Sequence, residues 1–457
     1  MQVEHAKVEE LRKNHRGAVI TPEESAYDPG RRVWNAMIDR RPALIVRPRS
    51  AVDVMAAVNF ARDNHLPLAI RGGAHSVAGN STCDAGLVID FCDMKAIHVD
   101  PKARTVRAEP GLRWSEFDRE TQAFGLATTG GTVGDTGIAG LTLGGGFGWL
   151  GGTLGMTVDN VLSLDLVLAS GELVHASASE NPDLFWALRG GGGNFGVVTS
   201  FTYQLHPVGP LIVGGMAVHP FSAAKDVMRF YSEVISHAPD ELTAACALLS
   251  LPDGQKACAM VVACTAPAAE AERLVAPIKK FGSPLVDIIG PMPYVAQQSL
   301  LENAMPPNVL NYWKADFVAS ISDGVIDNAI DAYSQVASPM SSLLFFPIHG
   351  VARRASADST AYPHRNGIHA GVYSLWKDST QNESNVEWVR KTWKGMQPHV
   401  PGGVYANELG EDDGDDRIRQ AYAGNYDRLS AIKAQYDPEN LFRLNANIRP
   451  APAVGVS

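Results

Sequence analysis

The sequence lacks the features that mark a metal centre, a disulfide framework or a membrane protein. Its 457 residues contain five cysteines, an odd number with no metal-binding spacing, so we expect reduced thiols and no metal site. No run of about 18 apolar residues occurs, which predicts no membrane span. The first residues are charged and lack the apolar core of a secretory signal. These absences favour a cytoplasmic protein.

Clustered positive charge and two common catalytic motifs are also missing. The net charge is −10 and no basic stripe is visible, so we do not expect a nucleic-acid partner. Neither the Gly-x-x-x-x-Gly-Lys-[Ser/Thr] phosphate loop nor the Gly-x-Ser-x-Gly nucleophile motif occurs. Negative charge is densest between Glu408 and Asp416, where six carboxylates predict a solvated loop.

Glycine, by contrast, is abundant and occurs in three dense segments. The first is Arg71-Gly72-Gly73-Ala74-His75-Ser76, which follows the apolar strand candidate 68–70. Two adjacent glycines allow a sharp turn whose backbone N–H groups can approach an anion closely. His75 is a nitrogen nucleophile and can bond covalently to an electrophilic cofactor. The segment predicts a phosphate-binding turn with a tethered dinucleotide, unless the histidine only forms hydrogen bonds within the turn.

The second segment holds twelve glycines between Gly130 and Gly155, and the third is 189–199. A flexible loop is one explanation for this density. However, apolar residues such as Phe147 and Trp149 are interleaved with the glycines, whereas flexible linkers are usually polar. Because glycine loses more conformational entropy on folding than other residues, the cluster indicates backbone packed directly against a large flat ligand.

The order of strands and helices argues against a nicotinamide-binding unit. Strand candidates lie at 68–70 and 87–89, and Ser50 with Asp53 predicts the start of a preceding helix. The glycine turn at 72–76 is followed by polar residues and another strand. A Rossmann phosphate site requires a long helix at that point, so the glycine pattern is the wrong one for that fold.

The second half of the chain has a different composition. Glycine density falls beyond 206–210, which we interpret as a domain boundary. Strand candidates such as 343–346 then alternate with helices. The expected helices are 223–237, 268–280, 325–338 and 385–396. This alternation predicts a sheet with helices over one face.

The glycine segments, in this order, resemble those of the FAD-linked oxidases of the vanillyl-alcohol-oxidase superfamily, within the berberine-bridge-enzyme-like group. Further matching blocks are Asp159–Leu162, Leu184–Thr199 and Tyr436–Ile448. The resemblance implies an α+β fold with a PCMH-type (p-cresol-methylhydroxylase type) FAD-binding domain and a second α+β substrate domain. The implied divisions are an FAD-binding domain at 1–207 with its core at about 38–207, a substrate-binding domain at 208–403, and a berberine-type segment at 404–457 that returns to the FAD domain.

By the same resemblance, His75 is bonded to the 8α-methyl group of FAD. Many relatives add a second bond from a cysteine, but the corresponding residue here is Gly130 and no cysteine lies near it, so we expect a single link. Arg71 and the amides of the turn should meet the pyrophosphate. Asn445 would approach the flavin or, alternatively, cap the last turn. The cofactor-binding candidates are Arg71, Gly72, Gly73, Ala74, His75, Ser76, Gly79, Thr129, Thr132, Val133, Gly134, Thr136, Gly137, Gly140, Gly144, Gly145, Gly148, Asn160, Val198, Asn445 and Asn447.

Removal of a hydride also requires a base for the substrate proton. Relatives often read Tyr-x-Asn-Tyr where this sequence has Tyr405-Ala406-Asn407-Glu408, and their second tyrosine can serve as the base. Glu408 would supply a carboxylate instead, although a surface glutamate at the head of the acidic run is an equal alternative. Some relatives carry a glutamate where this chain has Ser374, beside Tyr373. The catalytic candidates are therefore Tyr405, Glu408 and Tyr373.

The resemblance implies an FAD-dependent oxidase. It would take a hydride from an alcohol, amine, sugar, or phenolic or polycyclic natural product, and dioxygen would be reduced to hydrogen peroxide. The alternatives are a flavin dehydrogenase with another electron acceptor and a flavin-binding protein without turnover. The expected partners are a small-molecule substrate and dioxygen, and the protein would be a monomer or a homodimer.

Overall fold

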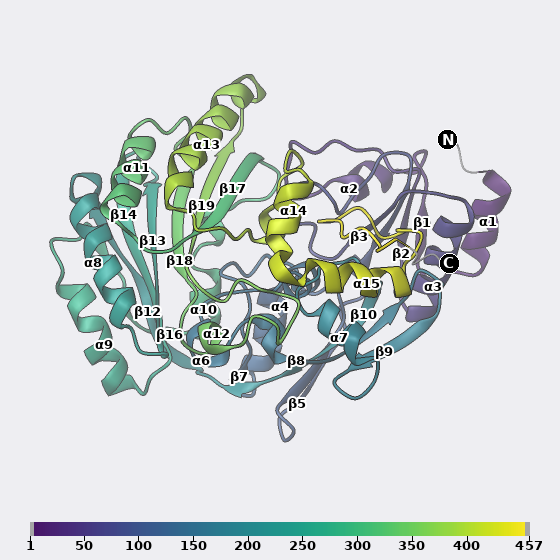
Figure 1. The fold of residues 1–457 in the computed structure, drawn as a ribbon, viewed down its shortest axis with the longest axis horizontal. Coiled ribbons are helices and arrows are strands. Elements are labelled where there is room, and N and C mark those ends of the chain that lie inside the picture. The colour runs from purple at the N-terminus through teal and green to yellow at the C-terminus, as the bar shows by residue number, and fades with distance from the viewer. Residues whose placement is uncertain (1–3, 453–457) are drawn as a thin grey trace.

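Two systems of β-strands divide the fold, as Figure 1 shows. The structure is a computed structural model, and it describes residues 4–452. The first system contains a four-stranded sheet, a five-stranded sheet and a two-stranded ribbon, whereas the second is a single eight-stranded sheet. Helices and strands are mixed throughout, which confirms the predicted α+β class. No helix within 4–452 is long and apolar enough to cross a lipid bilayer.

The four-stranded sheet carries the first glycine turn. Its strands, in spatial order, are β1 (Ala18–Ile20), β2 (Leu44–Arg47), β4 (Leu87–Asp90) and β3 (Leu68–Arg71). The last three are parallel, and β1 is antiparallel to β2. Helix α3 (Ala51–Asp63) begins at the predicted cap, where Ser50 Oγ accepts a hydrogen bond of 3.3 Å from the Asp53 amide. No helix lies between β3 and β4, which confirms that this is not a Rossmann unit.

The five-stranded sheet is antiparallel throughout. Its strands, in spatial order, are β5 (Ile97–Asp100), β6 (Thr105–Ala108), β10 (Val197–Gln204), β8 (Val161–Val167) and β9 (Leu173–Ser177). Leu164 and Leu166 of β8 are buried, whereas Leu162 is exposed at the start of the strand. The third glycine segment joins α7 (Pro182–Leu188) to β10, so this sheet positions the segment in the interior.

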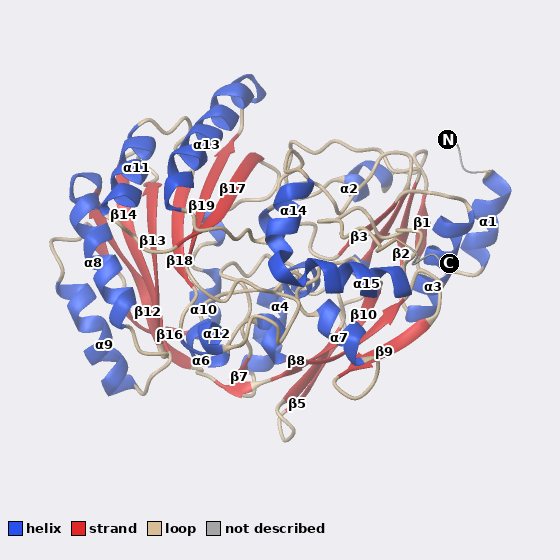
Figure 2. Cartoon of the chain, viewed as in Figure 1, coloured by secondary structure: helices blue, strands red, loops and turns tan. Residues whose placement is uncertain are grey.

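The second system confirms the expected sheet with helices over one face. Its strands, in spatial order, are β15 (Val286–Asp287), β12 (Leu211–Pro220), β14 (Lys256–Cys264), β13 (Leu242–Ser250), β18 (Ser342–Pro347), β19 (Ile368–Trp376) and β17 (Leu310–Val318), with β16 (Gly290–Pro293) beside β12. The helices are α8 (Ala224–His237), α9 (Ala268–Lys280), α11 (Asp323–Ser334) and α13 (Asn382–Met396), which lie on the outer face in Figure 2. Ala217 of β12 packs in the core under these helices, whereas its neighbour Met216 faces the opposite side.

The C-terminal segment packs against the first system. Helices α14 (Asp415–Tyr422) and α15 (Tyr426–Tyr436) cross the middle of the molecule in yellow in Figure 1. Leu429 and Ile432 of α15 join the core beneath the five-stranded sheet. Lys433 Nζ donates to the Asn194 carbonyl oxygen at 2.6 Å and to Asp437 at 2.6 Å, all within the protein interior. These contacts attach the end of the described chain to the third glycine segment.

The remaining α-helices and strands are short. They are α1 (His5–Lys13), α2 (Tyr27–Arg31), α4 (Trp114–Gln122), β7 (Leu126–Ala127), α5 (Ile138–Leu143), α6 (Gly151–Leu154), β11 (His206–Pro207), α10 (Tyr294–Ser299) and α12 (Gly350–Arg354). Helices α5 and α6 lie inside the second glycine segment, for which the sequence analysis predicted packed backbone but no helix. The five cysteines are all free thiols.

The prediction of a solvated acidic loop is wrong for part of the run. Asp413 is only 4% exposed because it forms ion pairs with Lys314 at 2.8 Å and Arg417 at 2.9 Å. The Glu408 side chain is 13% exposed, whereas Glu411 is 72% exposed and fits the prediction. Charge density alone did not reveal the cations that β17 and α14 bring to this loop.

Helix α4 meets α10 of the second system through a buried carboxyl group. Asp118 on α4 accepts a hydrogen bond of 2.9 Å from Gln298 on α10, and its side chain lies fully in the interior beside Tyr294. Burial raises the pKa of Asp118 to about 7, and the Gln298 bond only partly opposes this effect.

The Asp118 contact should make thermal stability depend on pH. The pKa of Asp118 in the folded state lies above the ordinary value. Its contribution to the free energy of unfolding is therefore complete at low pH and is lost as pH rises through about 7. Asp118→Asn keeps the shape of the group and cannot ionise. We expect the variant to melt several degrees above the wild type at pH 8 and close to it at pH 5, measured by differential scanning fluorimetry. Parallel curves for the two proteins at all pH values would contradict this assignment.

Candidate active site

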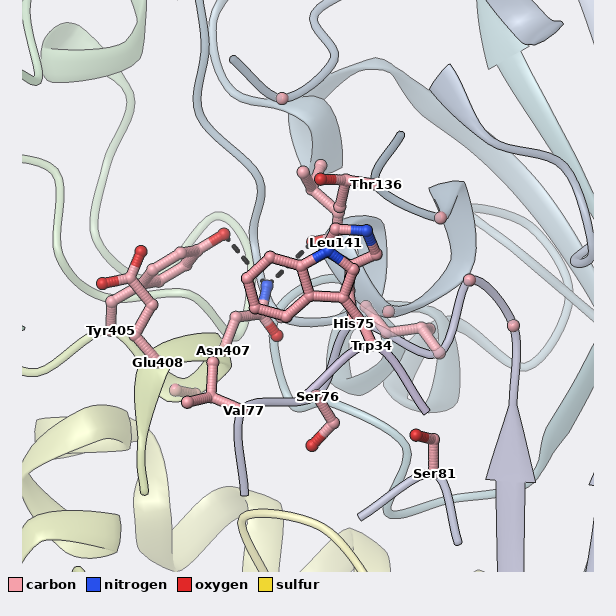
Figure 3. Close-up of a pocket in the computed structure, with 18 of the residues that line it drawn as sticks. Trp34, His75, Ser76, Val77, Ser81, Thr136, Leu141, Tyr405, Asn407 and Glu408 are labelled. Atoms are coloured by element: carbon pink, nitrogen blue, oxygen red, sulfur yellow. Dashed lines mark hydrogen bonds between the residues drawn. The ribbon is translucent and has the colours of Figure 1, made fainter. Parts of the chain in front are cut away.

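A cavity of about 400 Å³ lies where the two systems and the C-terminal segment meet. All three glycine segments contribute to its wall, together with the uncovered face of the eight-stranded sheet. Figure 3 shows part of this wall, with His75 and Thr136 of the first two segments and Tyr405 and Glu408 of the C-terminal segment. Its volume falls within the range of about 300–1,000 Å³ that is usual for ligand and cofactor sites. Among the described residues on its wall, His75 is the only histidine and Glu408 the only carboxylate, and no lysine or arginine is present.

The first two glycine segments touch each other at the cavity. A Cβ atom added to Gly73 would collide with the backbone of Gly137, and one added to Gly137 would collide with Gly73. The Ala74 backbone has φ of 62°, and its carbonyl oxygen accepts a hydrogen bond of 3.1 Å from the Trp34 amide. Glycine is therefore required here because two backbones pass at a distance that leaves no room for a side chain.

His75 is held on two sides. Its ring stacks on Trp34 with 4.9 Å between centroids and 23° between planes. Its Nε2 lies 3.0 Å from Asp135 Oδ2, and Arg113 pairs with the other oxygen of that carboxylate. Burial and the Arg113 charge lower the pKa of His75 to about 3, although the Asp135 carboxylate acts in the opposite direction. Burial thus favours the neutral imidazole, which is the nucleophilic form.

The three predicted catalytic residues lie together at the cavity wall. Glu408 accepts hydrogen bonds from His369 Nε2 at 2.9 Å and from the Tyr373 hydroxyl at 3.3 Å. His369 and Tyr373 both come from β19, whereas Glu408 follows Tyr405 in the C-terminal segment. The side chain of Glu408 is 13% exposed and lines the cavity, so it is not a surface glutamate.

Tyr405 is held in a defined orientation. Its hydroxyl oxygen accepts a hydrogen bond from the Gly146 amide at 3.3 Å and another from Asn407 Nδ2 at 2.9 Å. Figure 3 shows Asn407 between the Tyr405 hydroxyl and the Leu141 backbone. Burial, together with the Glu408 charge, raises the pKa of Tyr405 and also that of Tyr373 far above neutrality. Both tyrosines are thus neutral phenols, and Glu408 is the one of the three predicted catalytic residues that can accept a proton.

Two family models match the sequence. Residues 42–177 match a model described as "FAD binding domain", and residues 404–449 match one described as "Berberine and berberine like". An FAD-linked oxidoreductase from Dictyostelium discoideum is 33% identical over 91% of each chain. The chain belongs to the berberine-bridge-enzyme-like family of FAD-linked oxidoreductases.

Comparison with other members of the family supports the same assignment. The (R)-6-hydroxynicotine oxidase of Paenarthrobacter nicotinovorans is 28% identical over 95% of this chain and 97% of its own length. The crystal structure of 6-hydroxy-D-nicotine oxidase from Arthrobacter nicotinovorans superimposes with a TM-score of 0.88 at 27% identity, covering 96% of this chain and 98% of that one. The protein is an FAD-dependent oxidoreductase, and the predicted family, the fold class and FAD as the cofactor are confirmed, whereas the bond to His75 stays a prediction.

The cavity of this oxidoreductase suits a flavin dinucleotide. Asn445 lines the cavity, and its amide group donates to the Gly193 and Phe442 carbonyl oxygens at 3.0 Å each. Its Oδ1 is buried and accepts no hydrogen bond from the described residues. Since flavins carry both donors and acceptors on their polar edge, this oxygen is available to accept one from the cofactor. Its two donated bonds show that Asn445 also fixes the last turn, so both predicted roles are compatible.

Most predicted cofactor residues lie on the cavity wall, including the entire turn from Gly72 to Ser76. The others from the sequence prediction that do so are Thr132, Val133, Thr136, Gly137, Gly140, Gly144, Val198 and Asn445. Arg71 does not, contrary to expectation: its buried guanidinium donates to the backbone carbonyl oxygens of Gly30 and Ser81 behind the turn. Any pyrophosphate contact in this segment therefore depends on the backbone amides rather than on Arg71.

The remaining predicted residues have contacts within the protein instead of on the cavity. They are Gly79, Thr129, Gly134, Gly145, Gly148, Asn160 and Asn447. Asn160 donates to the carbonyl oxygens of Leu154 and Met156 at 2.9 and 3.0 Å. A Cβ atom on Gly148 would collide with the Gly130 carbonyl oxygen. Gly148 and Asn160 therefore support the second glycine segment from behind, which sequence similarity alone could not distinguish from direct cofactor contact.

Sequence analysis missed four residues of the site, namely Trp34, Asp135, His369 and Asn407. His369 lies in β19, where all nine residues are buried, so no alternating pattern marked it. Asn407 was visible only as part of the Tyr-x-Asn pattern. Asp135 did leave a signal, because it is the single charged residue between Gly130 and Gly155. Trp34 lies far from the glycine segments in sequence and left none.

Proposed function

We propose that this protein is an FAD-dependent oxidase of small apolar substrates that contain a ring, with Glu408 as the base and dioxygen as the electron acceptor. The observation that carries the proposal is the Glu408 carboxylate, which lies on the cavity wall and accepts hydrogen bonds from His369 and Tyr373. These two donors hold the carboxylate in place for proton transfer from a substrate O–H or N–H group.

When bound, FAD would supply the acceptor for the hydride that leaves the substrate. The chain's own residues would manage the proton and the substrate orientation. Glu408 would accept the proton at a carboxylate oxygen. The Tyr405 oxygen already accepts two hydrogen bonds, so its own proton is available to donate to the substrate or cofactor. The eight-stranded sheet would close the site against water.

The walls of the cavity favour an apolar substrate. The eight-stranded sheet contributes Met216, Leu249, Val261, Trp313 and Leu344 to the lining. No lysine or arginine of the described chain lines the cavity, so a carboxylate or phosphate group on the substrate would find no cationic side chain to pair with. A sugar would leave several hydroxyl groups without hydrogen bonds, at a cost of about 1–3 kcal/mol each. A ring-bearing alcohol, phenol or amine fits better, and one relative is named as an oxidase of 6-hydroxynicotine.

We also propose that FAD is attached through His75 by a single covalent bond. The neutral imidazole on the cavity wall supports the attachment. No cysteine of the described chain lines the cavity, which supports the absence of a second link. A Cβ atom at Gly130 would lie 2.8 Å from the Trp114 indole, so a cysteine could not replace this glycine without displacing a fully buried ring.

Gly130→Cys tests this explanation of the single link. We expect the variant to gain no second bond and to be destabilised by about 1–3 kcal/mol, because the added side chain overpacks the core at Trp114. The number of bonds is read from peptide mass spectrometry after proteolysis, and the destabilisation from the melting temperature. Gly290→Cys is the control, since a Cβ atom there meets nothing within 4 Å and the residue does not have a left-handed φ. A stable, doubly linked variant would contradict the packing argument.

A substrate screen tests the proposed activity. Under anaerobic conditions, ring-bearing alcohols, phenols and amines should bleach the flavin absorbance, whereas sugars and organic acids should not. Under air, turnover should then produce stoichiometric hydrogen peroxide. Bleaching with slow reoxidation in air would identify a dehydrogenase with another acceptor. No bleaching by any compound would favour a flavin-binding protein without turnover.

A further inference from the structure

One carboxylate approaches the predicted attachment residue from behind the cavity. Asp135 does not line the cavity, but its Oδ2 lies 3.0 Å from His75 Nε2. Its other oxygen pairs with Arg113, which begins helix α4. The Asp135 side chain is 24% exposed and that of His75 is 15% exposed, so the contact is largely shielded from water. The arrangement is a row of Arg113, Asp135 and His75 that ends at the cavity.

The backbone fixes Asp135 in this place. The Trp114 amide donates to the Thr136 carbonyl oxygen at 3.0 Å, and the Ser115 amide donates to that of Gly134 at 2.8 Å. The residues on both sides of Asp135 are thus attached to the start of α4. The close approach of Gly73 and Gly137 then holds the His75 turn against the same segment. Because both partners are positioned by main-chain contacts, their geometry does not depend on flexible side chains.

We propose that Asp135, held by Arg113, is the positioning residue that prepares His75 for its bond to FAD. A carboxylate can only accept, so the single proton of the neutral imidazole lies on Nε2. The lone pair of Nδ1 is then free to act as the nucleophile, and stacking on Trp34 fixes the plane of the ring. Selecting the tautomer in this way is the role that the aspartate has in a serine-protease triad. The inference rests on the proposed His75–FAD bond.

The attachment reaction shows why a carboxylate is useful here. A bond forms between Nδ1 and the 8α-carbon of FAD, and one C–H bond of that methyl group breaks. The two electrons pass through the flavin to dioxygen, and the hydrogen peroxide formed carries the methyl hydrogen and the imidazole proton. Positive charge develops on the ring while Nδ1 forms its bond. Asp135 offsets that charge through its contact with Nε2.

The test follows the covalent addition of FAD to the full-length chain, purified from cells grown without riboflavin. Attachment is measured against time as flavin fluorescence of the protein band on a denaturing gel, which needs no substrate. Asp135→Asn should attach FAD at least about tenfold more slowly than the wild type, the size of effect seen for other partners that orient histidine ligands. Arg113 can only donate, so the new amide oxygen stays with it and the amide N–H group faces His75. The imidazole proton then moves to Nδ1 and blocks the nucleophile.

The chain contains a matched control. Asp165 also accepts from a histidine, His175, at 2.7 Å, and also pairs with an arginine, Arg107, at 2.9 Å. This second row lies on β6, β8 and β9 and contributes nothing to the cavity wall. Asp165→Asn should therefore attach FAD at the wild-type rate. A slow rate in both variants would overturn the proposal, because it would reflect a general loss of stability.

A second variant distinguishes the proposed role of Asp135 from misfolding of Asp135→Asn. Asp135→Ala leaves space beside a partly exposed site, so acetate should restore the attachment rate, whereas chloride at equal ionic strength should not. Failure of acetate to accelerate attachment, or wild-type kinetics in Asp135→Asn, would overturn the role of Asp135. A wild-type chain that binds FAD but never becomes fluorescent on the gel would instead refute the His75 bond itself. The two failures are therefore distinguishable.

Discussion

Acid precipitation of the purified protein is expected to give a yellow pellet, and the same treatment of His75→Ala a colourless pellet with yellow supernatant. Acid unfolds the chain and releases any flavin held only by hydrogen bonds and packing, whereas a covalent bond to the imidazole survives. The expected effect is complete, because no cysteine of the described chain lines the cavity to provide another attachment point. Absorbance of both fractions near about 450 nm, a general property of flavins, measures the result.

His175→Ala is the matched control for this experiment. His175 also hydrogen-bonds an aspartate, Asp165, but it lies outside the cavity wall. Its variant should keep the yellow pellet. The His75→Ala protein should still bind FAD before acid is added, because the glycine segments and Asn445 remain. A colourless wild-type pellet would show that the cofactor is not tethered.

Glu408→Gln is expected to lower the rate of flavin reduction by about 10²–10⁴-fold, the usual contribution of a positioned general base. Glutamine keeps the size of the side chain but cannot take a proton from the substrate. The defect should appear in kcat, with a smaller change in KM, because the lost interaction concerns the reacting proton. Anaerobic stopped-flow measurement of flavin reduction, with a substrate found in the screen, isolates this step.

Glu411→Gln separates the base from general effects of charge. Glu411 lies three residues further along the same loop, is 72% exposed and pairs with Arg40. Its variant should reduce flavin within about twofold of the wild type, since exposed ion pairs contribute little energy. A large loss in Tyr405→Phe together with normal reduction in Glu408→Gln would transfer the role of base to Tyr405, against the raised pKa of that phenol.

Predictions from local sequence patterns were confirmed where the conformation depends on neighbouring residues in the chain. The Ser50 cap, the β3 strand and the glycine turn that follows it all depend on residues within a few positions of one another. The same holds for the four helices of the second system, whose bounds agree with the apolar periodicity to within a few residues. Long family motifs also predicted the cofactor, because they occur in three separate segments of the chain.

Contacts between residues that lie far apart in the sequence were predicted less well. Arg71 directly precedes the glycine turn, yet its side chain is turned behind it to hydrogen-bond Gly30 and Ser81. The acidic run was expected to be solvated, but Lys314 and Arg417 bury Asp413 within it. Both outcomes depend on which elements pack nearby, and residue type does not carry that information.

The sequence by itself determined the class of fold and the flavin cofactor, because the glycine turns and family motifs that indicate them are continuous segments of the chain. Only the tertiary structure decided which groups surround the reacting atoms. His369 reaches Glu408 across 39 residues and Asp135 reaches His75 across 60. Such pairs form when separate sheets and turns pack together, and that packing depends on shape and burial over the whole molecule rather than on neighbouring residues.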